Sequence, residues 1–294
     1  MDLAVQGGKR TLRYERFSDW RKDFQSRHGG GAKVLFVPTM GALHQGHAEL
    51  VRQARTLADS IQGGPTEVVV SVFINPTQFN EADDFDAYPM TPDEDARLVS
   101  ESGADAVVFP TVEEMYPGGV PSAAEPVDYG PLTASLEGEM RPGHFDGVVG
   151  VVRTLFQHTR PQWAFFGEKD WQQLAVIRHL AELEFEGLEV VAVPTRREED
   201  GLAMSSRNRR LSPEDRVLAP LLHQALLEVA EADRPEAAAK AATVSLEAAG
   251  FEVEYLSVAK ADTLEPSLVR QGEMRVFAAA RLGGVRLIDN VACH

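Results

Sequence analysis

Two histidines with two residues between them, His44 and His47, occupy the stretch PTMGALHQGH, where an apolar run gives way to a helical pattern. The first turn of a helix offers N–H groups and the positive end of the helix dipole, and both favour phosphate. Two imidazoles there would donate to the oxygens of a triphosphate as charge develops on them. Gly41 and Gly46 would let the backbone approach a nucleotide closely. The alternatives are surface histidines or a histidine that caps the helix; zinc is disfavoured because further ligands at suitable spacing are missing.

Two other segments carry groups that suit a nucleotide. GEKD, Gly167 to Asp170, ends the apolar run WAFFG, so Lys169 could pair with a phosphate while Asp170 accepts from ribose hydroxyls. MSSRNRR, Met204 to Arg210, combines two hydroxyls with three guanidinium groups, which suits a loop that closes on a triphosphate. The structural alternatives are a solvated helix start for GEKD and a basic surface loop near a helix cap for MSSRNRR.

The motifs of several other enzyme classes are missing from the sequence. It contains no GxxxxGK[ST] phosphate loop, no GxGxxG after a predicted strand and no GxSxG elbow. Its single cysteine, Cys293, excludes an internal disulfide and argues against a thiol nucleophile or a cysteine metal site. The sequence therefore lacks the motifs that would support a kinase, a dehydrogenase or a hydrolase.

The composition narrows the class of protein further. Its 294 residues are 44% hydrophobic and 25% charged, as in ordinary globular proteins, and no apolar run approaches the ~20 residues of a membrane helix. A net charge of −16 repels nucleic acid and anionic lipid, so an anionic substrate would need a local basic pocket. The first thirty residues mix charges and lack the apolar segment of an export signal. We therefore expect a cytoplasmic protein with small-molecule substrates and neither nucleic-acid nor membrane partners.

Apolar runs that alternate with helical patterns predict an α/β fold. This alternation is typical of a doubly wound, Rossmann-like parallel sheet, in which ligands bind beyond the carboxyl ends of the strands. PTMGALHQGH, INPTQF and FGEKD all lie at the ends of predicted strands and could line one crevice. Thr91 to Glu94 predicts a capping box with proline at the first helical position. The predicted strands are 32–40, 67–76, 106–110, 163–167 and 188–195, and the helices are 47–61, one from 91, 146–160 and 169–184.

The pattern changes from about residue 195. A helix over 212–232, capped by Ser212, and an Ala-rich helix over 235–249 are joined by strand-like alternation over 251–259 and 274–290. This predicts a second, smaller α+β domain. The expected organisation is a Rossmann-like ligand-binding domain over residues 1–194 and a smaller C-terminal α+β lid domain over 195–294.

Taken together, seven stretches resemble the ordered signature series of the pantoate-beta-alanine ligase (pantothenate synthetase) family, of the HxGH nucleotidyltransferase-like superfamily. They run from about residue 33 to the C-terminus: PTMGALHQGH, VSVFINPTQF, FDAYP, LEGEMRPGHFDGV, FFGEKDWQQL, REEDGLAMSSRN and RLIDN. The resemblance implies that (R)-pantoate and ATP give pantoyl adenylate and pyrophosphate, after which the amine of beta-alanine displaces AMP and forms pantothenate, a coenzyme A precursor. It also implies that the 1–194 domain binds ATP and pantoate and that the chain forms a homodimer. Mg²⁺ is expected with ATP because it binds mainly through the phosphates; the sequence leaves its protein ligands unassigned, with Glu94 and Asp95 as the only candidates.

The resemblance further implies roles for single residues. Gln78 would bind pantoate and lie near beta-alanine, and Gln173 would bind pantoate. The backbone of Arg196 would meet adenine. The catalytic groups would be His47 as proton donor, with His44, Lys169 and Arg207. The ATP contacts would be Met40, Gly41, Ala42, Leu43, His44, Gln45, Gly46, His47, Gly167, Glu168, Lys169, Asp170, Arg196, Met204, Ser205, Ser206 and Arg207.

Two positions depart from the family pattern. Trp171 replaces the usual tyrosine after GEKD, which keeps an aromatic side chain there. Met90 replaces a common arginine, and this second replacement puts a loop contact and substrate affinity in doubt. Two alternatives to a ligase remain at this point. One is an HxGH nucleotidyltransferase that transfers AMP to a phosphate, which would leave the paired glutamines without a purpose. The other is a nucleotide-binding module without catalysis.

Overall fold

In a computed structural model, which describes residues 11–29, 31–78, 89–121, 123–267 and 272–293, the chain divides into two compact units. The first unit comprises Met1–Val127, Arg141–Gly167 and Val176–Val193. The second comprises Asp128–Met140, Glu168–Ala175 and Pro194–His294. The division into domains at residue 194 stays a prediction. No helix among the described residues is long and apolar enough to cross a membrane.

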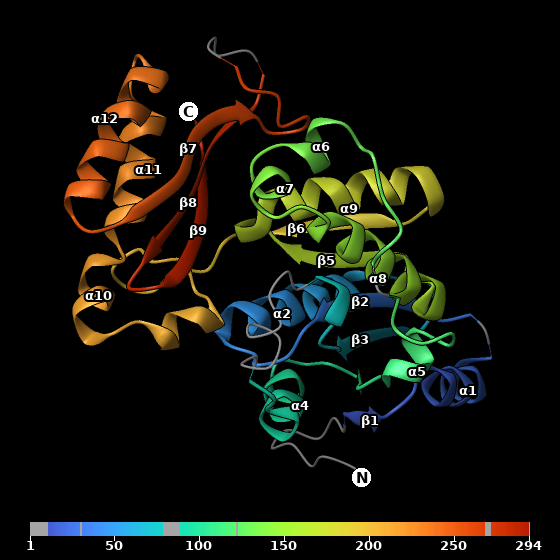
Figure 1. The fold of residues 1–294 in the computed structure, drawn as a ribbon. Coiled ribbons are helices and arrows are strands. Elements are labelled where there is room, and N and C mark those ends of the chain that lie inside the picture. The colour runs from blue at the N-terminus through green and yellow to red at the C-terminus, as the bar shows by residue number, and fades with distance from the viewer. Residues whose placement is uncertain (1–10, 30, 79–88, 122, 268–271, 294) are drawn as a thin grey trace. The chain divides into compact units, whose positions relative to one another are not determined.

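A parallel six-stranded sheet forms the centre of the first unit (Figure 1), as predicted. Every pairing between its strands is parallel. The strands, in the order β1-β4-β3-β2-β5-β6, are β1 (Leu12–Tyr14), β4 (Ala106–Val108), β3 (Thr66–Val72), β2 (Lys33–Thr39), β5 (Trp163–Gly167) and β6 (Glu189–Val193). The helices of this unit include α1 (Phe17–His28), α2 (Gln45–Ser60), α4 (Pro92–Glu101), α5 (Val112–Met115) and α8 (His144–Thr159), while α9 (Trp171–Glu184) contributes residues to both units.

Both faces of this sheet are covered. Successive side chains of a strand point to opposite faces, so a strand that is apolar throughout needs a partner on each face. Leu35 and Val37 of β2 belong to a core that also contains Val51 of α2 and Val99 of α4. The intervening Phe36 packs edge-on against Phe156 of α8, with ring centroids 6.4 Å apart. The continuous apolar runs seen in the sequence are therefore buried parallel strands.

The strand order reverses between β2 and β5. The chain leaves β2 through α2 toward β3, but leaves β5 through α9 toward β6 on the other side. Leu35 pairs with Trp163, and continuing this register brings Thr39 level with Gly167. In open parallel sheets such a switch point is where ligands bind. The stretches that follow β2 and β5 are PTMGALHQGH and GEKD, as the sequence predicted.

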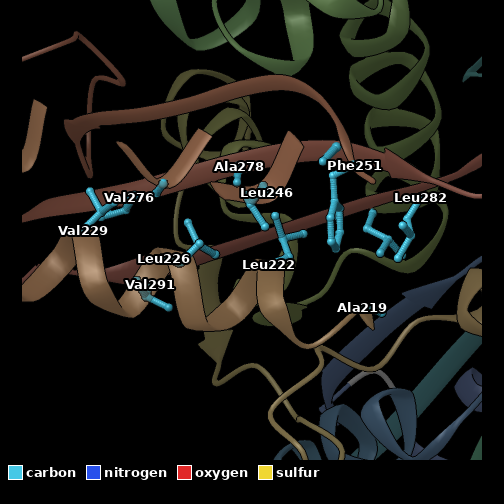
Figure 2. Close-up of a cluster of buried hydrophobic side chains, with 14 of the residues drawn as sticks. Ala219, Leu222, Leu226, Val229, Leu246, Phe251, Val276, Ala278, Leu282 and Val291 are labelled. Atoms are coloured by element: carbon cyan, nitrogen blue, oxygen red, sulfur yellow. The ribbon is translucent and has the colours of Figure 1, made fainter. Parts of the chain in front are cut away.

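The second unit contains an antiparallel sheet of β7 (Glu252–Lys260), β8 (Met274–Leu282) and β9 (Val285–Ala292). Figure 2 shows its core, in which Leu222 and Leu226 of α11 pack against Val276 and Ala278 of β8. The other elements are α6 (Pro131–Ala134), α7 (Glu137–Met140), α10 (Pro213–Leu218), α11 (Leu221–Glu231), α12 (Pro235–Ala248) and two 3₁₀ helices, η2 (Glu168–Asp170) and η3 (Ser206–Arg210).

Two predicted local features differ from the structure. The helix expected over 212–232 is interrupted at Ala219 and Pro220, because proline lacks the N–H that would continue the helical ladder. Thr91 precedes α4 and Pro92 is its first residue, but the Thr91 side chain makes no cap. Its hydroxyl donates instead to the Asp95 carboxylate at 3.1 Å, so the predicted capping box is wrong.

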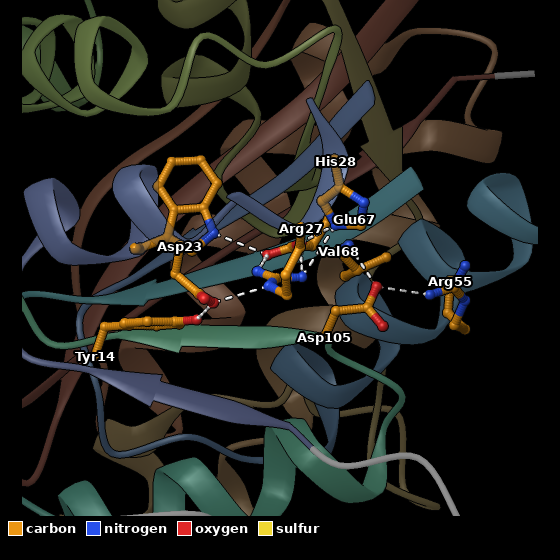
Figure 3. Close-up of polar contacts among 9 residues, drawn as sticks. Tyr14, Asp23, Arg27, His28, Arg55, Glu67, Val68 and Asp105 are labelled. Carbon is orange, nitrogen blue, oxygen red and sulfur yellow. Dashed lines mark hydrogen bonds and ion pairs between the residues drawn. The ribbon is translucent and has the colours of Figure 1, made fainter. Parts of the chain in front are cut away.

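β1 and α1 lie within the first thirty residues, where no helix or strand was predicted. Glu67, at the start of β3, is 1% exposed and ties α1 to the sheet (Figure 3). Its carboxylate accepts two hydrogen bonds from Arg27, at 2.7 and 3.1 Å, and one from Trp20 Nε1 at 2.9 Å. His28 Nε2 lies 3.0 Å from the same carboxylate. The buried acid of β3 thus meets its partners on α1.

Candidate active site

The two histidines close the first turn of α2. His44 is the N-cap residue, and its Nδ1 accepts a hydrogen bond from the Gly46 N–H at 3.1 Å. In return, His47 Nδ1 accepts from the His44 N–H at 3.2 Å, which completes a capping box made of two imidazoles. The ring centroids lie 4.2 Å apart. The capping alternative raised by the sequence is therefore correct.

These hydrogen bonds fix the tautomer of both rings. A neutral imidazole that accepts at Nδ1 carries its proton on Nε2. His44 and His47 therefore each hold an Nε2–H donor beside the positive end of the α2 dipole. Capping the helix and donating to an anion use different nitrogens of the same ring, so the two roles are compatible.

Asp95 of α4 holds the loop that leads to these histidines. Its carboxylate is 2% exposed and accepts from the Leu43 N–H at 2.8 Å and the Ala42 N–H at 3.1 Å. Burial raises the pKa of Asp95, although these N–H groups oppose the rise. The loop needs this support because Gly41 and Ala42 have φ angles of +96° and +50°. A side chain at Gly41 would meet an Asp95 oxygen at 3.2 Å, so that glycine permits the close approach.

Gln78 lies at the end of η1 (Pro76–Gln78), directly beyond β3. Its amide donates to the Met40 sulfur, which brings the INPTQF and PTMGALHQGH stretches together. Asn75, 1% exposed, donates to Gln78 Oε1 at 3.1 Å and to the Gly147 carbonyl at 3.2 Å. The Tyr116 hydroxyl donates to Asn75 Oδ1 at 2.5 Å. Sequence reasoning missed Asn75 and Tyr116, which orient Gln78.

The amino end of α8 also holds Gln78. His144 Nδ1 lies 3.1 Å from the Gln78 carbonyl, and Arg141 donates to the same oxygen at 3.4 Å. A side chain at Gly147 would lie 2.5 Å from the Thr77 carbonyl, so the glycine lets η1 pack directly on α8. LEGEMRPGHFDGV, which the sequence marked only as a signature stretch, supplies these three residues.

In the second unit, Glu168 to Asp170 of GEKD form η2, whereas Lys169 and Asp170 were predicted to begin the following helix. Lys169 Nζ lies 3.4 Å from Asp170 Oδ1, and its side chain is 18% exposed. Trp171 follows, and its Nε1 donates to the Ala261 carbonyl at 2.6 Å. The Arg275 guanidinium lies 3.7 Å from the centroid of the indole ring. The tryptophan that departs from the family pattern is therefore a packed aromatic residue.

The two glutamines of DWQQL have different surroundings. Gln172 is 4% exposed; it donates to the carbonyls of Leu132 and Ser135 and accepts from the Glu137 N–H. Those bonds fold the 132–137 segment. Gln173 is partly exposed. Of the pair, Gln173 is the less buried; its predicted contact with pantoate stays a prediction.

The 196–210 segment is partly ordered by its own hydrogen bonds. The Met204 N–H donates to the Arg196 carbonyl at 3.0 Å, which joins two predicted ATP-binding positions. Ser205 is the N-cap of η3, and its hydroxyl accepts from the Arg207 N–H at 3.3 Å. MSSRNRR was expected to be a loop, but Ser206 to Arg210 form a 3₁₀ helix with Ser205 as its cap.

No group of three or more His, Cys, Asp or Glu side chains suited to a metal occurs among the residues that the structure covers. Met90, in place of the common arginine, is 78% exposed. Most of the FDAYP stretch, residues 85–88, and Phe79 of NPTQF lie outside the described residues.

Residues 13–292 match the family model of pantoate-beta-alanine ligase, which covers nearly all of the chain. The chain belongs to the pantoate-beta-alanine ligase family. It is 49% identical over 268 residues to the pantothenate synthetase of Acidiphilium cryptum, covering 90% of this chain and 93% of that protein. It is also 49% identical over 283 residues to the pantothenate synthetase of Cereibacter sphaeroides, covering 94% and 95%. The family resemblance and the ligase class are therefore confirmed.

Solved structures of the pantoate-beta-alanine ligase family have the same fold. The pantothenate synthetase of Thermus thermophilus is 42% identical and superposes with a TM-score of 0.86 over 97% of this chain and all of that one. The pantoate-beta-alanine ligase of Francisella tularensis, solved in complex with beta-gamma ATP and beta-alanine, is 31% identical with a TM-score of 0.76, over 96% and 97% of the two chains. The predicted α/β fold with a separate small domain of sheet and helices is confirmed.

Proposed function

We propose that this chain condenses (R)-pantoate with beta-alanine at the expense of ATP. Family membership supports the reaction, and the imidazole capping box of His44 and His47 is the observation of this chain that carries it. That pair supplies two Nε2–H donors at a helix amino end, where a triphosphate is best bound. The products are pantothenate, AMP and pyrophosphate.

The reaction proceeds in two displacements. A carboxylate oxygen of pantoate attacks the α-phosphorus of ATP, and the bond from that phosphorus to the β-bridging oxygen breaks, which releases pyrophosphate. The neutral amine of beta-alanine then attacks the acyl carbon of pantoyl adenylate, the bond to AMP breaks, and the amine loses a proton. Neither step needs a protein nucleophile, only alignment and stabilisation of developing charge.

In the first unit, His44 and His47 bind the phosphate oxygens, and His47 supplies the proton to the leaving pyrophosphate. The Met40 to Gly46 backbone contacts the nucleotide. Gln78 binds the pantoate and lies near beta-alanine. Its amide is oriented for this by Asn75 and Met40, and its carbonyl by His144.

In the second unit, Gly167 to Asp170 contact the ribose and phosphates, with Lys169 neutralising charge; Gly167 itself ends β5 of the first unit. The Arg196 backbone meets adenine, Gln173 binds pantoate, and Met204 to Arg207 bind the phosphates. Ser205 has a second task besides this one, since its hydroxyl caps η3. Arg207 supplies a charged donor that stabilises the transition state.

Magnesium enters as the MgATP substrate, bound mainly through the phosphates. The protein ligands proposed for it, Glu94 and Asp95, differ in their suitability. Glu94 is exposed, whereas both oxygens of Asp95 already accept backbone N–H groups. Glu94 is therefore the better candidate of the two. A cytoplasmic location and a homodimer complete the proposal.

Pantoate-dependent exchange of pyrophosphate with ATP, measured without beta-alanine, tests this function. We expect exchange only when pantoate is present, because the first displacement is reversible and needs no amine. Exchange that ignores pantoate would refute the ligase. Tight ATP binding without any exchange would favour the non-catalytic module, and AMP transfer to a phosphate acceptor would favour the nucleotidyltransferase.

A further inference from the structure

RLIDN, the last signature stretch of the chain, received no role from the sequence. It lies in β9, and its Asp289 and Asn290 are 5% and 3% exposed. Buried polar side chains of this kind are retained where they are fully hydrogen-bonded. Their partners therefore indicate what the stretch does.

Asn290 binds the backbone of GEKD. Its Nδ2 donates to the Glu168 carbonyl and to the Lys169 carbonyl, both at 2.9 Å. Its Oδ1 accepts from Arg275 Nε at 2.8 Å, which fixes the orientation of the amide. Because both N–H groups of the amide bind consecutive carbonyls, the side chain fixes the backbone path of η2 and with it the backbone position of Lys169.

Arg275 extends this support. Its guanidinium lies over the Trp171 ring, and its Nη2 is 3.7 Å from a Glu168 carboxylate oxygen. Arg275 is 9% exposed, so its contacts are made in a dry environment where electrostatic attraction is stronger. GEKD and the residue after it are thus held by two side chains from the antiparallel sheet.

Asp289 holds the other predicted nucleotide segment of this unit. It accepts from both terminal nitrogens of Arg197, at 2.6 and 3.0 Å, and Arg197 also donates to the Gly201 carbonyl at 3.1 Å. Burial alone would raise the pKa of Asp289, but His223, whose Nδ1 lies 3.4 Å from the carboxylate, and the hydrogen bonds and charge of Arg197 hold the pKa below its usual range. Asp289 is therefore ionised and anchors the turn that leads from Arg196 to Met204.

We propose that Asp289 and Asn290 are the positioning residues of the nucleotide site in the second unit. From adjacent positions of one strand, they hold the two segments that contact ATP, Asn290 through the GEKD carbonyls and Asp289 through Arg197. Neither touches the nucleotide. This assignment rests on the proposed function, because the roles of Lys169 and Arg196 belong to it.

The test replaces Asn290 by aspartate in the full chain. Asn290→Asp keeps the shape and the acceptor for Arg275, but it sets a carboxylate oxygen against two carbonyls in place of an NH₂ group. We expect the Kd for ATP, measured by calorimetry, and the KM for ATP to rise about tenfold, or about 1.4 kcal/mol. The KM for beta-alanine should stay within about twofold, since the loss of a hydrogen-bond donor acts on the nucleotide segments alone.

Tyr255→Phe is the matched control in the same unit. It removes one hydrogen bond, from the Tyr255 hydroxyl to Glu137 at 2.6 Å, outside the predicted ATP contacts. It should lower the melting temperature and leave the Kd for ATP unchanged. If Tyr255→Phe weakens ATP binding as much as Asn290→Asp does, or if Asn290→Asp binds ATP normally, the assignment is wrong.

Two further measurements keep the outcomes distinct. Should Asn290→Asp not fold, Asn290→Ser, which keeps one donor, replaces it and should weaken ATP binding by a smaller factor; normal binding in that variant would overturn the assignment. Wild-type protein that binds ATP but shows no pantoate-dependent exchange would refute the proposed function alone, because the comparison of ATP affinities would still decide the role of Asn290.

Discussion

His44 and His47 use one nitrogen each to close the first turn of α2, and the consequence is chemical as well as structural. Because Nδ1 accepts a backbone N–H in both rings, rotation of either imidazole would break the capping box. The donors at Nε2 are therefore held in place before any ligand binds. Preorganised donors of this kind stabilise developing charge without the cost of reorienting during the reaction.

Capping and phosphate contact are separable by substitution. His47→Gln keeps a side-chain acceptor for the His44 N–H, since glutamine is a usual third residue of a capping box, and His44→Asn keeps a favourable N-cap. We expect both variants to melt within a few degrees of the wild type. His47→Gln should lose pyrophosphate exchange by about 100-fold or more, because it lacks the proton donor. Near-normal exchange in a folded His47→Gln protein would show that His47 only caps the helix.

Asp95→Asn tests the support of the histidine loop. In the wild type the N–H groups of Ala42 and Leu43 bind different oxygens of the Asp95 carboxylate, whereas an amide offers them only one oxygen. We therefore expect a loss of about 1–2 kcal/mol in the free energy of unfolding and slower pyrophosphate exchange. Thr91→Val is the control, because it removes one donor to Asp95 and leaves both backbone bonds. If Thr91→Val slows exchange as much as Asp95→Asn does, the loss of the backbone bonds is not the cause.

The pH dependence of Asp95→Asn has a definite sign. Burial raises the pKa of Asp95 in the folded chain above its ordinary 3.8, so ionisation opposes folding there. The stability of the wild type relative to the variant should therefore be greatest below that ordinary value. It should fall as the pH rises through the raised pKa and then stay constant. Urea unfolding of both proteins at a series of pH values measures this, and a wild-type advantage that grows with pH would contradict it.

Among the helices and strands, the sequence predicted those whose apolar residues recur with a regular period. β2, β3 and α2 were found because each is a long run with one clear apolar period. α1 was missed because its buried residues, Phe17, Trp20 and Phe24, are few among charged ones, and its anchor on Glu67 lies about forty residues further along the chain.

In the candidate site, too, the sequence predicted only what a local pattern can show. His44, His47, Lys169 and Gln78 stand in compact stretches that local pattern can identify. Their supports cannot be found that way: Asp95 reaches Leu43 across 52 residues of sequence, and Asn290 reaches Glu168 across 122. Such partners are selected by tertiary packing, which leaves no periodic signal in one sequence. Asp95 was marked beforehand only as a candidate magnesium ligand, and Asn75, His144 and Asn290 only as members of signature stretches, without a role.

Breaking the anchor of α1 should separate stability from activity. Arg27→Met leaves the buried Glu67 without its main charged partner, so the free energy of unfolding should fall by about 2–3 kcal/mol. Glu67 is at the amino end of β3, about 16 Å along the strand from Val72, beyond which Gln78 follows. The KM for ATP at low temperature should therefore be unchanged. Arg97→Gln, which breaks an exposed pair with Glu101, should alter neither quantity; a raised KM for ATP in Arg27→Met would place the anchor in the site.

Any ligand that binds only the folded chain raises its stability. The proposed reaction predicts how the stabilisation by ATP changes when pantoate and then beta-alanine are added. A hundredfold excess of ATP over its Kd adds about 2.7 kcal/mol, or roughly 5–10 °C in melting temperature for a chain of this size. ATP with pantoate should add more, because pantoyl adenylate stays bound when no amine is present, and beta-alanine should remove that increment by consuming it. His47→Gln should keep most of the ATP shift, because the glutamine amide can still donate a hydrogen bond to a phosphate oxygen, and it should lack the increment, because the amide cannot supply a proton. If pantoate adds nothing to the ATP shift in the wild type, the chain does not hold the adenylate.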